Sequence, residues 1–161
     1  MPSSSRAAAK RSTAKRSVAK SAGKGRVGQL PEWNLADLYP SIDAPSLKRD
    51  LEWGEADCVE FEQAYKGKLA EIVSGPDAGR VLAEAVKRYE KIEDVLGRVM
   101  SYAGLIHAGN TTDPAIGKFY GDMQERITAA SLHLLFFTLE MNRLDDAALE
   151  AAMADPALGH Y

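Results

Sequence analysis

Apolar side chains recur at alternating steps of three and four residues along the middle of this chain. The series consists of Leu82, Ala85, Tyr89, Ile92, Leu96, Val99, Ala103 and Ile106. Such spacing brings every member to one side of an α-helix, as in helices that pack lengthwise against each other. We therefore predict one long helix from about Asp77 to Ala108. Gly97 and Gly104 lie within it at a cost of about 1 kcal/mol each relative to alanine, so we expect another backbone to approach closely there.

Two further stripes predict two further long helices. The first helix begins near Pro45, has a candidate break at Gly67 and ends at residues 74–77. Another begins at Asp113 and Pro114, a favourable cap and first-turn pair, and continues to about Leu144. The two stripes are Leu47, Leu51, Gly54, Cys58, Phe61, Tyr65, Leu69 and Ile72, and Phe119, Met123, Ile127, Ala130, Leu134, Phe137, Met141 and Leu144.

The remaining segments complete an all-α prediction. The stretch "LPEWNLADLYPSIDAPS" contains three prolines and predicts an extended, anchored entry segment. The stretch "DDAALEAAMA", which precedes Pro156, predicts a short fourth helix. No stretch has the pattern of a β-strand. We expect an elongated layer of three long antiparallel helices plus the short fourth, without a sheet.

Charge is distributed unevenly along the chain. Residues 1–31 contain eight basic side chains and no acidic one, whereas the other 130 residues have a net charge near −11. Residues 1–30 are too polar to offset their ordering entropy, so we predict a disordered basic tail. A transit peptide, a nucleic-acid-binding arm and a membrane-surface patch are open alternatives to a solvated tail without a specific role. The acidic body argues against a wide contact with nucleic acid.

The single cysteine and the hydropathy bear on location. Cys58 has no partner for an internal disulfide, which fits a reducing compartment and leads us to expect a cytoplasmic protein. A membrane span needs roughly 20 apolar residues, and the longest uncharged run near the apolar maximum covers only residues 127–139. No apolar region of the kind found in secretory signals follows the first methionine. Cys58 lies in the first stripe, where we expect a buried and unreactive thiol.

The stretch "LHLLFFTLEM" contains a histidine and, seven residues later, a glutamate. His133 and Glu140 lie about two turns apart, roughly 10 Å, and cannot share one metal ion. We expect His133 to lie at a helix–helix boundary with one ring nitrogen hydrogen-bonded. The sequence contains no H-E-x-x-H motif, and it offers no catalytic, cofactor-binding or metal-ligating residue.

The same stretch is apolar nearly all round. Leu132, Leu135, Phe136 and Leu139 lie more than about 120° from the centre of the predicted core stripe. A helix of this kind is buried on both sides. Two neighbours within the chain are one way to cover both sides, and docking of one side onto a partner structure is the other. We expect these four side chains to dock onto a partner, and we expect the chain alone to self-associate or to bind apolar dyes.

Several stretches together resemble the N-terminal region of the oligoendopeptidase F family of zinc peptidases. They are "LPEWNLADLYPS", "FEQAYKGKLA", "LGRVMSYAGLIHAGNTTDP" and "KFYGDMQERITAASLHLLFFTLEMNRLDD". The resemblance covers about residues 31–161 and involves no catalytic motif. It implies a helical domain over residues 31–161 that is incomplete at its C-terminal end.

The resemblance also implies a role. Family members are large helical enzymes that cut short peptides in a narrow channel, using zinc held by an H-E-x-x-H helix and a later glutamate. Those elements lie in a C-terminal catalytic region, to which no position of this sequence corresponds. The chain would form part of the channel wall and would be inactive alone, with the catalytic domain docked on Leu132, Leu135, Phe136 and Leu139. The alternative is a non-enzymatic helical scaffold whose basic arm binds an acidic partner.

Overall fold

A computed structural model describes residues 34–161, in which all regular structure is helical. The predicted basic tail at residues 1–30 lies outside the described residues. The predicted all-α fold is confirmed for the part that the structure describes. In chain order the elements are η1 (Leu35–Asp37), α1 (Pro45–Tyr65), α2 (Leu69–Ser74), α3 (Ala78–Gly109), α4 (Pro114–Ser131), η2 (Leu132–Leu134), α5 (Leu135–Met141), α6 (Asp146–Met153) and η3 (Pro156–Leu158), where η denotes a 3₁₀ turn.

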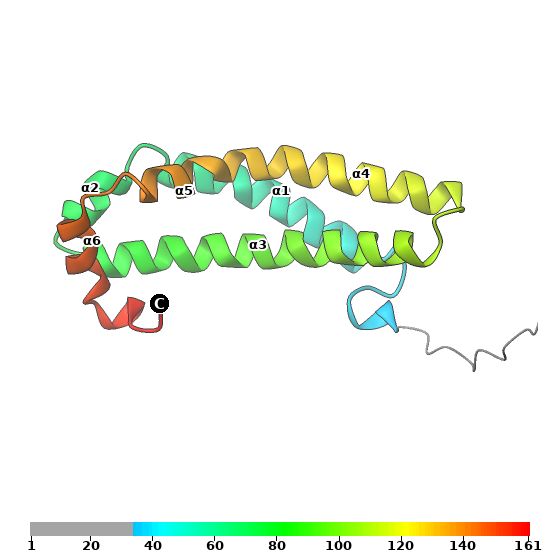
Figure 1. The fold of residues 1–161 in the computed structure, drawn as a ribbon, viewed down its shortest axis with the longest axis horizontal. Coiled ribbons are helices and arrows are strands. Elements are labelled where there is room, and N and C mark those ends of the chain that lie inside the picture. Colours follow the sequence, from blue (N-terminus) through cyan, green and yellow to red (C-terminus); the bar gives the residue numbers. More distant parts are fainter. Residues whose placement is uncertain (1–33) are drawn as a thin grey trace, which may run out of the picture. The chain divides into compact units, whose positions relative to one another are not determined.

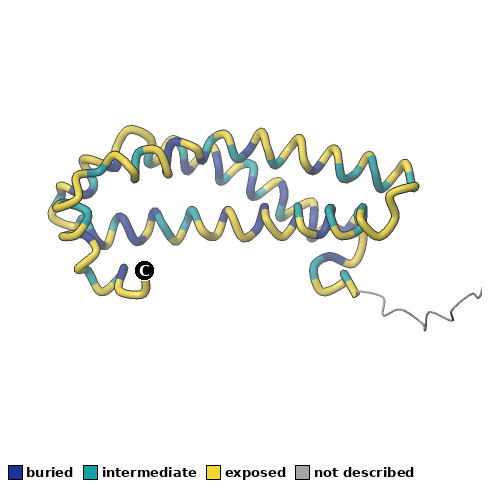
Figure 2. The backbone as a smooth tube through the Cα atoms, viewed as in Figure 1, coloured by how far each residue is buried: buried dark blue, intermediate teal, exposed yellow. Residues whose placement is uncertain are grey.

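The three long helices pack against one another in pairs. α1, α3 and α4 each contact the other two, and α3 runs antiparallel to α4 (Figure 1). The buried residues of these helices turn toward their neighbours, while the outward faces are exposed (Figure 2). The predicted stripes supply many of the buried core side chains, which include Leu47, Leu51, Phe61, Ile92, Leu96, Val99, Leu134 and Phe137, whereas Tyr39 and Tyr102 enter the core from outside the stripes. Helical periodicity therefore located the core correctly.

Local capping signals fix several helix ends. Pro45 and Pro114 occupy the first turns of α1 and α4, where the missing proline N–H would have had no helical partner. The Asp113 carboxylate accepts hydrogen bonds from the N–H groups of Ala115 and Ile116, at 2.8 and 3.4 Å. Asp145 caps α6 by accepting from Ala148 N–H at 3.0 Å. These capped positions confirm the predicted starts of all three helices.

A buried tyrosine anchors the entry segment. Tyr39 is 2% exposed, and its ring packs edge-on against Tyr102 of α3 with 5.3 Å between centroids. Its hydroxyl donates to Asp50 Oδ2 on α1 at 2.8 Å. Burial and the nearby Asp50 carboxylate raise the pKa of the Tyr39 hydroxyl well above its usual range. The expected anchor is confirmed at Tyr39, whereas the expected extended conformation is wrong at Leu35–Asp37, which form η1.

The first long stripe is divided between two helices. α1 ends at Tyr65 and α2 begins at Leu69, as the candidate break at Gly67 predicts. Gly67 has a φ of +77°, a left-handed conformation that costs other residues roughly 1–2 kcal/mol. The glycine thus allows the chain to turn and lets α2 continue the buried stripe through Leu69.

The helix predicted from Pro114 to Leu144 is wrong as a single element. A 3₁₀ turn, η2, separates α4 from α5 at Leu132–Leu134. Each 3₁₀ residue advances about 120° round the axis instead of about 100°, so three residues rotate the following helix by roughly 60°. The side chains of α5 therefore face directions that an uninterrupted helix would not give.

The close approaches occur at glycines other than those expected. A Cβ at Gly97 would meet nothing within 4 Å, and one at Gly104 would meet only Tyr120 Cε2 at 3.9 Å, so the expected backbone contact is wrong at both. A Cβ at Gly54 would lie 2.5 Å from Leu96 Cδ2. Gly97 therefore faces open space and Gly104 faces only the Tyr120 ring, whereas Gly54 makes room for Leu96 between α1 and α3.

A second, smaller hydrophobic cluster holds the C-terminal elements. Its buried members are Val73, Leu82, Ala83, Ala152 and Leu158. α6 and η3 both pack on the N-terminal part of α3. A Cβ at Gly79 would come within 2.1 Å of Asp155 Cβ and 2.6 Å of the Ala152 carbonyl oxygen. The glycine therefore permits the C-terminal elements to approach the α3 backbone.

A candidate docking surface on α5

Three leucines form an exposed apolar row along η2 and α5. Leu132, Leu135 and Leu139 are 62%, 54% and 56% exposed, more than the other large apolar side chains of the described residues. The same short segment carries Leu134, Phe136 and Phe137 on its buried side. We call Leu132, Leu135 and Leu139 the leucine row. Exposed apolar side chains that lie together in this way mark surfaces that bind partners.

Phe136 does not belong to this row, which corrects one of the four predicted docking residues. Its side chain is only 8% exposed and lies 5.7 Å from Phe61 of α1, measured between ring centroids. The rotation introduced by η2 turns Phe136 toward the core, whereas Leu135 and Leu139 stay outside. Residues 132–134 contain no glycine or proline, so no local signal in the sequence predicts the turn.

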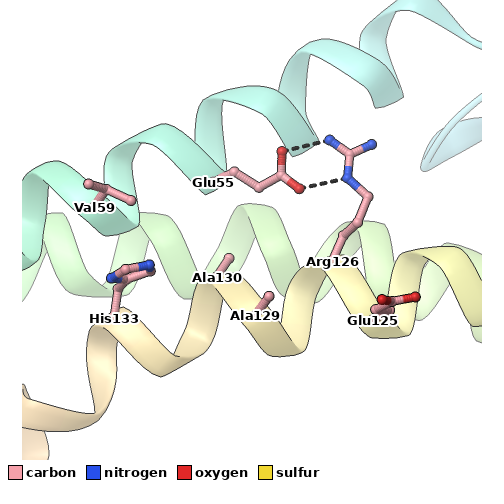
Figure 3. Close-up of a pocket in the computed structure, with 7 residues that line it drawn as sticks. All are labelled: Glu55, Val59, Glu125, Arg126, Ala129, Ala130 and His133. Atoms are coloured by element: carbon pink, nitrogen blue, oxygen red, sulfur yellow. Dashed lines mark hydrogen bonds and ion pairs between the residues drawn. The ribbon is translucent and has the colours of Figure 1, made fainter.

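His133 lies where α4 and η2 meet α1. Its Nδ1 atom is 2.5 Å from Glu62 Oε2, and its side chain is 39% exposed. In Figure 3 the His133 ring extends from the α4 side toward α1, near Val59. The predicted histidine at a helix–helix boundary, with one nitrogen bonded, is confirmed.

Two carboxylates connect this region to the break between α1 and α2. Glu62 also binds Lys66 Nζ at 2.5 Å, and Lys66 and then His133 lower the pKa of the Glu62 carboxyl. Glu140 accepts a hydrogen bond from the Gly67 N–H at 2.8 Å. His133 and Glu140 thus have separate structural partners. Neither Glu62 nor the Gly67 contact follows from the sequence pattern, because the residues that meet lie more than seventy positions apart.

A groove of about 340 Å³ separates α1 from α4 beside His133. Arg126 crosses it to form two hydrogen bonds with the Glu55 carboxylate, both 2.6 Å long (Figure 3). Glu55 raises the pKa of the Arg126 guanidinium. Val59, Ala129 and Ala130 supply the apolar part of the lining. The polar groups that line this groove are the Glu55–Arg126 ion pair, the hydrogen-bonded His133 and Glu125, and the ion pair joins α1 to α4.

A second groove, of about 480 Å³, runs between α3, α5 and the C-terminal residues. It is lined mainly by apolar side chains, among them Val86, Met141 and Met153. Tyr89 and Phe137 stack inside this region at 4.9 Å between centroids. At the rim, the Tyr161 hydroxyl donates to Glu90 Oε2 at 2.5 Å, and this contact raises the pKa of Tyr161 to about 12. The groove offers apolar surface without a set of groups that could perform catalysis.

Two further possibilities for chemistry are a reactive cysteine and a cluster of metal-ligating side chains. Cys58 is completely buried, and burial, followed by nearby acidic groups, raises the pKa of its thiol to about 11. The thiol therefore stays protonated at neutral pH, as expected for an unreactive core cysteine. Between residues 34 and 161, no cluster of three or more histidine, cysteine, aspartate or glutamate side chains has an arrangement that could hold a metal ion.

Two further findings bear on function. None of the helices in residues 34–161 combines the length and apolar character that crossing a membrane requires. The chain matches no protein-family profile, no curated protein and no solved structure.

Proposed function

We propose that this chain is a helical module of a zinc-dependent oligoendopeptidase and is inactive alone. In the complete enzyme it would form part of the wall of a channel that admits short peptides. Its role is to bind the catalytic domain through the leucine row. The zinc and the residues that activate water would belong to that domain, and the enzyme would work in the cytoplasm.

The exposure of the leucine row is the observation that carries this proposal. Full burial of one leucine side chain contributes about 1.5–3 kcal/mol, and three such side chains remain more than half exposed. Their inward neighbours Leu134 and Phe137 are almost completely buried. A partner that covered the row would recover the free energy that the chain alone leaves unused.

The charged groups beside the row are consistent with a supporting role. Glu55 is paired with Arg126, and Glu62 is paired with both Lys66 and His133. Each pair joins two helical elements or lies at the C-terminal end of α1. The peptidase part of the proposal derives from the resemblance of residues 31–161 to the oligoendopeptidase F family.

The first test compares the 161-residue chain with the protein from its native source. An antiserum against residues 34–161 would recover the native polypeptide, whose mass, zinc content and peptidase activity are then measured. We expect a larger zinc protein that cleaves short unstructured peptides and spares folded proteins, and a chain that cleaves nothing. Chelator-sensitive cleavage by the chain alone would overturn the proposal, as would a native protein without zinc.

A second candidate function arises from the distribution of charge. Eight basic and no acidic residues in positions 1–31 contrast with the acidic remainder, a pattern suited to an arm that binds an acidic partner. In this case the chain would be a non-enzymatic scaffold. Binding of double-stranded nucleic acid, measured with and without residues 1–30 at several salt concentrations, separates the two functions. Tight, salt-sensitive binding that disappears on deletion favours the scaffold.

A further inference from the structure

Two helix breaks lie side by side in this fold. The first separates α1 from α2 around Gly67, and the second is η2, between α4 and α5. α1 packs against η2, and α2 packs against α5. In Figure 1, α1, α2 and α5 come together at the same end of the long helices. The leucine row begins in the second break and continues along α5.

Two polar contacts join the breaks. His133 Nδ1 lies 2.5 Å from Glu62 Oε2, and the Gly67 N–H donates to Glu140 Oε1 at 2.8 Å. His133 is in η2, near one end of the row, and Glu140 follows Leu139 at the other end. We call these two contacts the clamp. It holds η2–α5 at two points that lie seven residues apart in sequence.

We propose that the clamp fixes the rotation of η2–α5 about its axis and thereby keeps Phe136 in the core, so that the leucine row alone forms the exposed apolar surface. This inference rests on the proposed function, because it names the residues that present the docking surface. Apolar packing is not directional, and Phe136 or the leucines could satisfy it with the segment rotated. Hydrogen bonds are directional, so two of them at separate points select one rotation. His133 and Glu140 are therefore positioning residues.

The geometry of η2 indicates which alternative conformation the clamp excludes. Without η2, α4 would continue into α5 with a rotation that differs by roughly 60°. Phe136 would then turn away from Phe61 toward solvent. The clamp opposes this change because a rotation of the segment would carry His133 away from Glu62 and Glu140 away from Gly67.

Hydrogen exchange of the 161-residue chain tests the clamp without any partner. Glu140→Ala removes one contact, and we expect the amides of residues 135–142 to exchange roughly tenfold faster, since a hydrogen bond to a charged group is lost. Glu140→Gln retains an oxygen that accepts from Gly67 N–H, so we expect it to restore most of the protection. His133→Ala removes the other contact independently, and we expect the same region to exchange faster.

The matched control is Glu55→Ala, which removes the ion pair between α1 and α4 at Arg126, outside both breaks. We expect protection in α5 to remain as in the unmodified chain. Equal exchange in the Glu140→Ala and Glu140→Gln variants would overturn the proposal, as would equal acceleration by Glu55→Ala. It would also be overturned if Glu140→Ala and His133→Ala unfolded the whole chain, because the contacts would then serve general stability.

The outcome of this exchange experiment can be distinguished from the outcome of the test of the proposed function. Exchange in the chain alone reports on the clamp, whereas zinc content and peptide cleavage by the native protein report on the peptidase role. A clamp without a peptidase would give protected α5 amides and no zinc. A peptidase without a clamp would give a zinc enzyme whose α5 exchange is unaffected by Glu140→Ala.

Discussion

Leu135 and Phe136 are adjacent in sequence but have opposite environments. Leu135 is 54% exposed, whereas Phe136 is 8% exposed and packs among Phe61 and Phe137. The difference in exposure between these two side chains depends on the rotation that η2 gives α5. An uninterrupted helix would have made Phe136 a surface residue.

We therefore expect that replacing these two adjacent residues by alanine changes the free energy of unfolding by very different amounts. Phe136→Ala should lower the free energy of unfolding by about 3–5 kcal/mol, because it leaves a cavity in the aromatic core. Leu135→Ala should change it by less than about 0.5 kcal/mol. Urea denaturation followed by circular dichroism measures both. Equal effects would contradict the structure of η2.

Glu62 links stability to pH. Its pKa is lowered from the ordinary value of 4.5, first by the hydrogen bond from Lys66 and then by that to His133. A carboxyl whose pKa is lower in the folded state than in the unfolded state stabilises the fold at pH values above its unfolded-state pKa. This contribution disappears as the pH falls through the folded-state pKa. The titratable groups that contact the Glu62 carboxylate are Lys66 and His133.

The prediction is that Glu62→Gln destabilises the chain at pH 6 and has little effect near pH 2. Unfolding by urea at a series of pH values would measure the gap between the variant and the unmodified chain. The gap should close as the pH falls below about 4, which is the range that a lowered carboxyl pKa implies. A gap that stayed constant down to pH 2 would show that the ionised carboxylate contributes nothing.

The helices show which signals in the sequence determine an element and which do not. Pro45, Asp113 and Asp145 mark helix starts, and Gly67 marks a break; all four are visible locally. The turn η2 has no such marker. It coincides with contacts to residues of α1 and to Gly67 that lie more than seventy positions away, which sequence periodicity does not register.

Glycines in α3 give a matched pair of predictions at this scale. Gly79→Ala would place a methyl group 2.1 Å from Asp155 Cβ and 2.6 Å from the Ala152 carbonyl oxygen, so α6 and η3 must move. Gly97→Ala meets nothing within 4 Å and should stabilise α3 by up to about 1 kcal/mol. Thermal unfolding of both variants measures the difference, with loss of protection in α6 and η3 expected only for Gly79→Ala. Similar melting temperatures for the two variants would be inconsistent with the close approach at Gly79.

On the scale of the whole molecule, the leucine row decides how the chain behaves in solution. A variant with Leu132→Ser, Leu135→Ser and Leu139→Ser should associate less and bind less of an apolar dye than the unmodified chain. Leu105 on α3 is 39% exposed, so Leu105→Ser serves as a control outside the row. Sedimentation velocity and dye fluorescence give the measurement. A monomeric unmodified chain without dye binding would argue against an uncovered docking surface.

The predictions from sequence agree best with the structure where burial depends on the periodicity of a single helix. The stripes along α1 and α3 identified core residues such as Phe61 and Val99 because burial follows helical periodicity directly. The predicted exposure was right for three leucines and wrong for Phe136, because a single turn of different pitch changed the rotation of the residues after it. The polar contacts at Glu62 and Glu55 depend on which helices meet, and one sequence does not provide that.

α3 contributes to both hydrophobic clusters, with Leu82 and Ala83 in the smaller one and Ile92 and Val99 in the larger. The smaller cluster, which holds α6 and η3, buries fewer side chains than the larger one. Proteins open in cooperative parts whose opening free energies follow the apolar contacts that each part would lose. The first sub-global opening of this chain should therefore release α6 and η3 alone, while the three long helices and the leucine row stay intact.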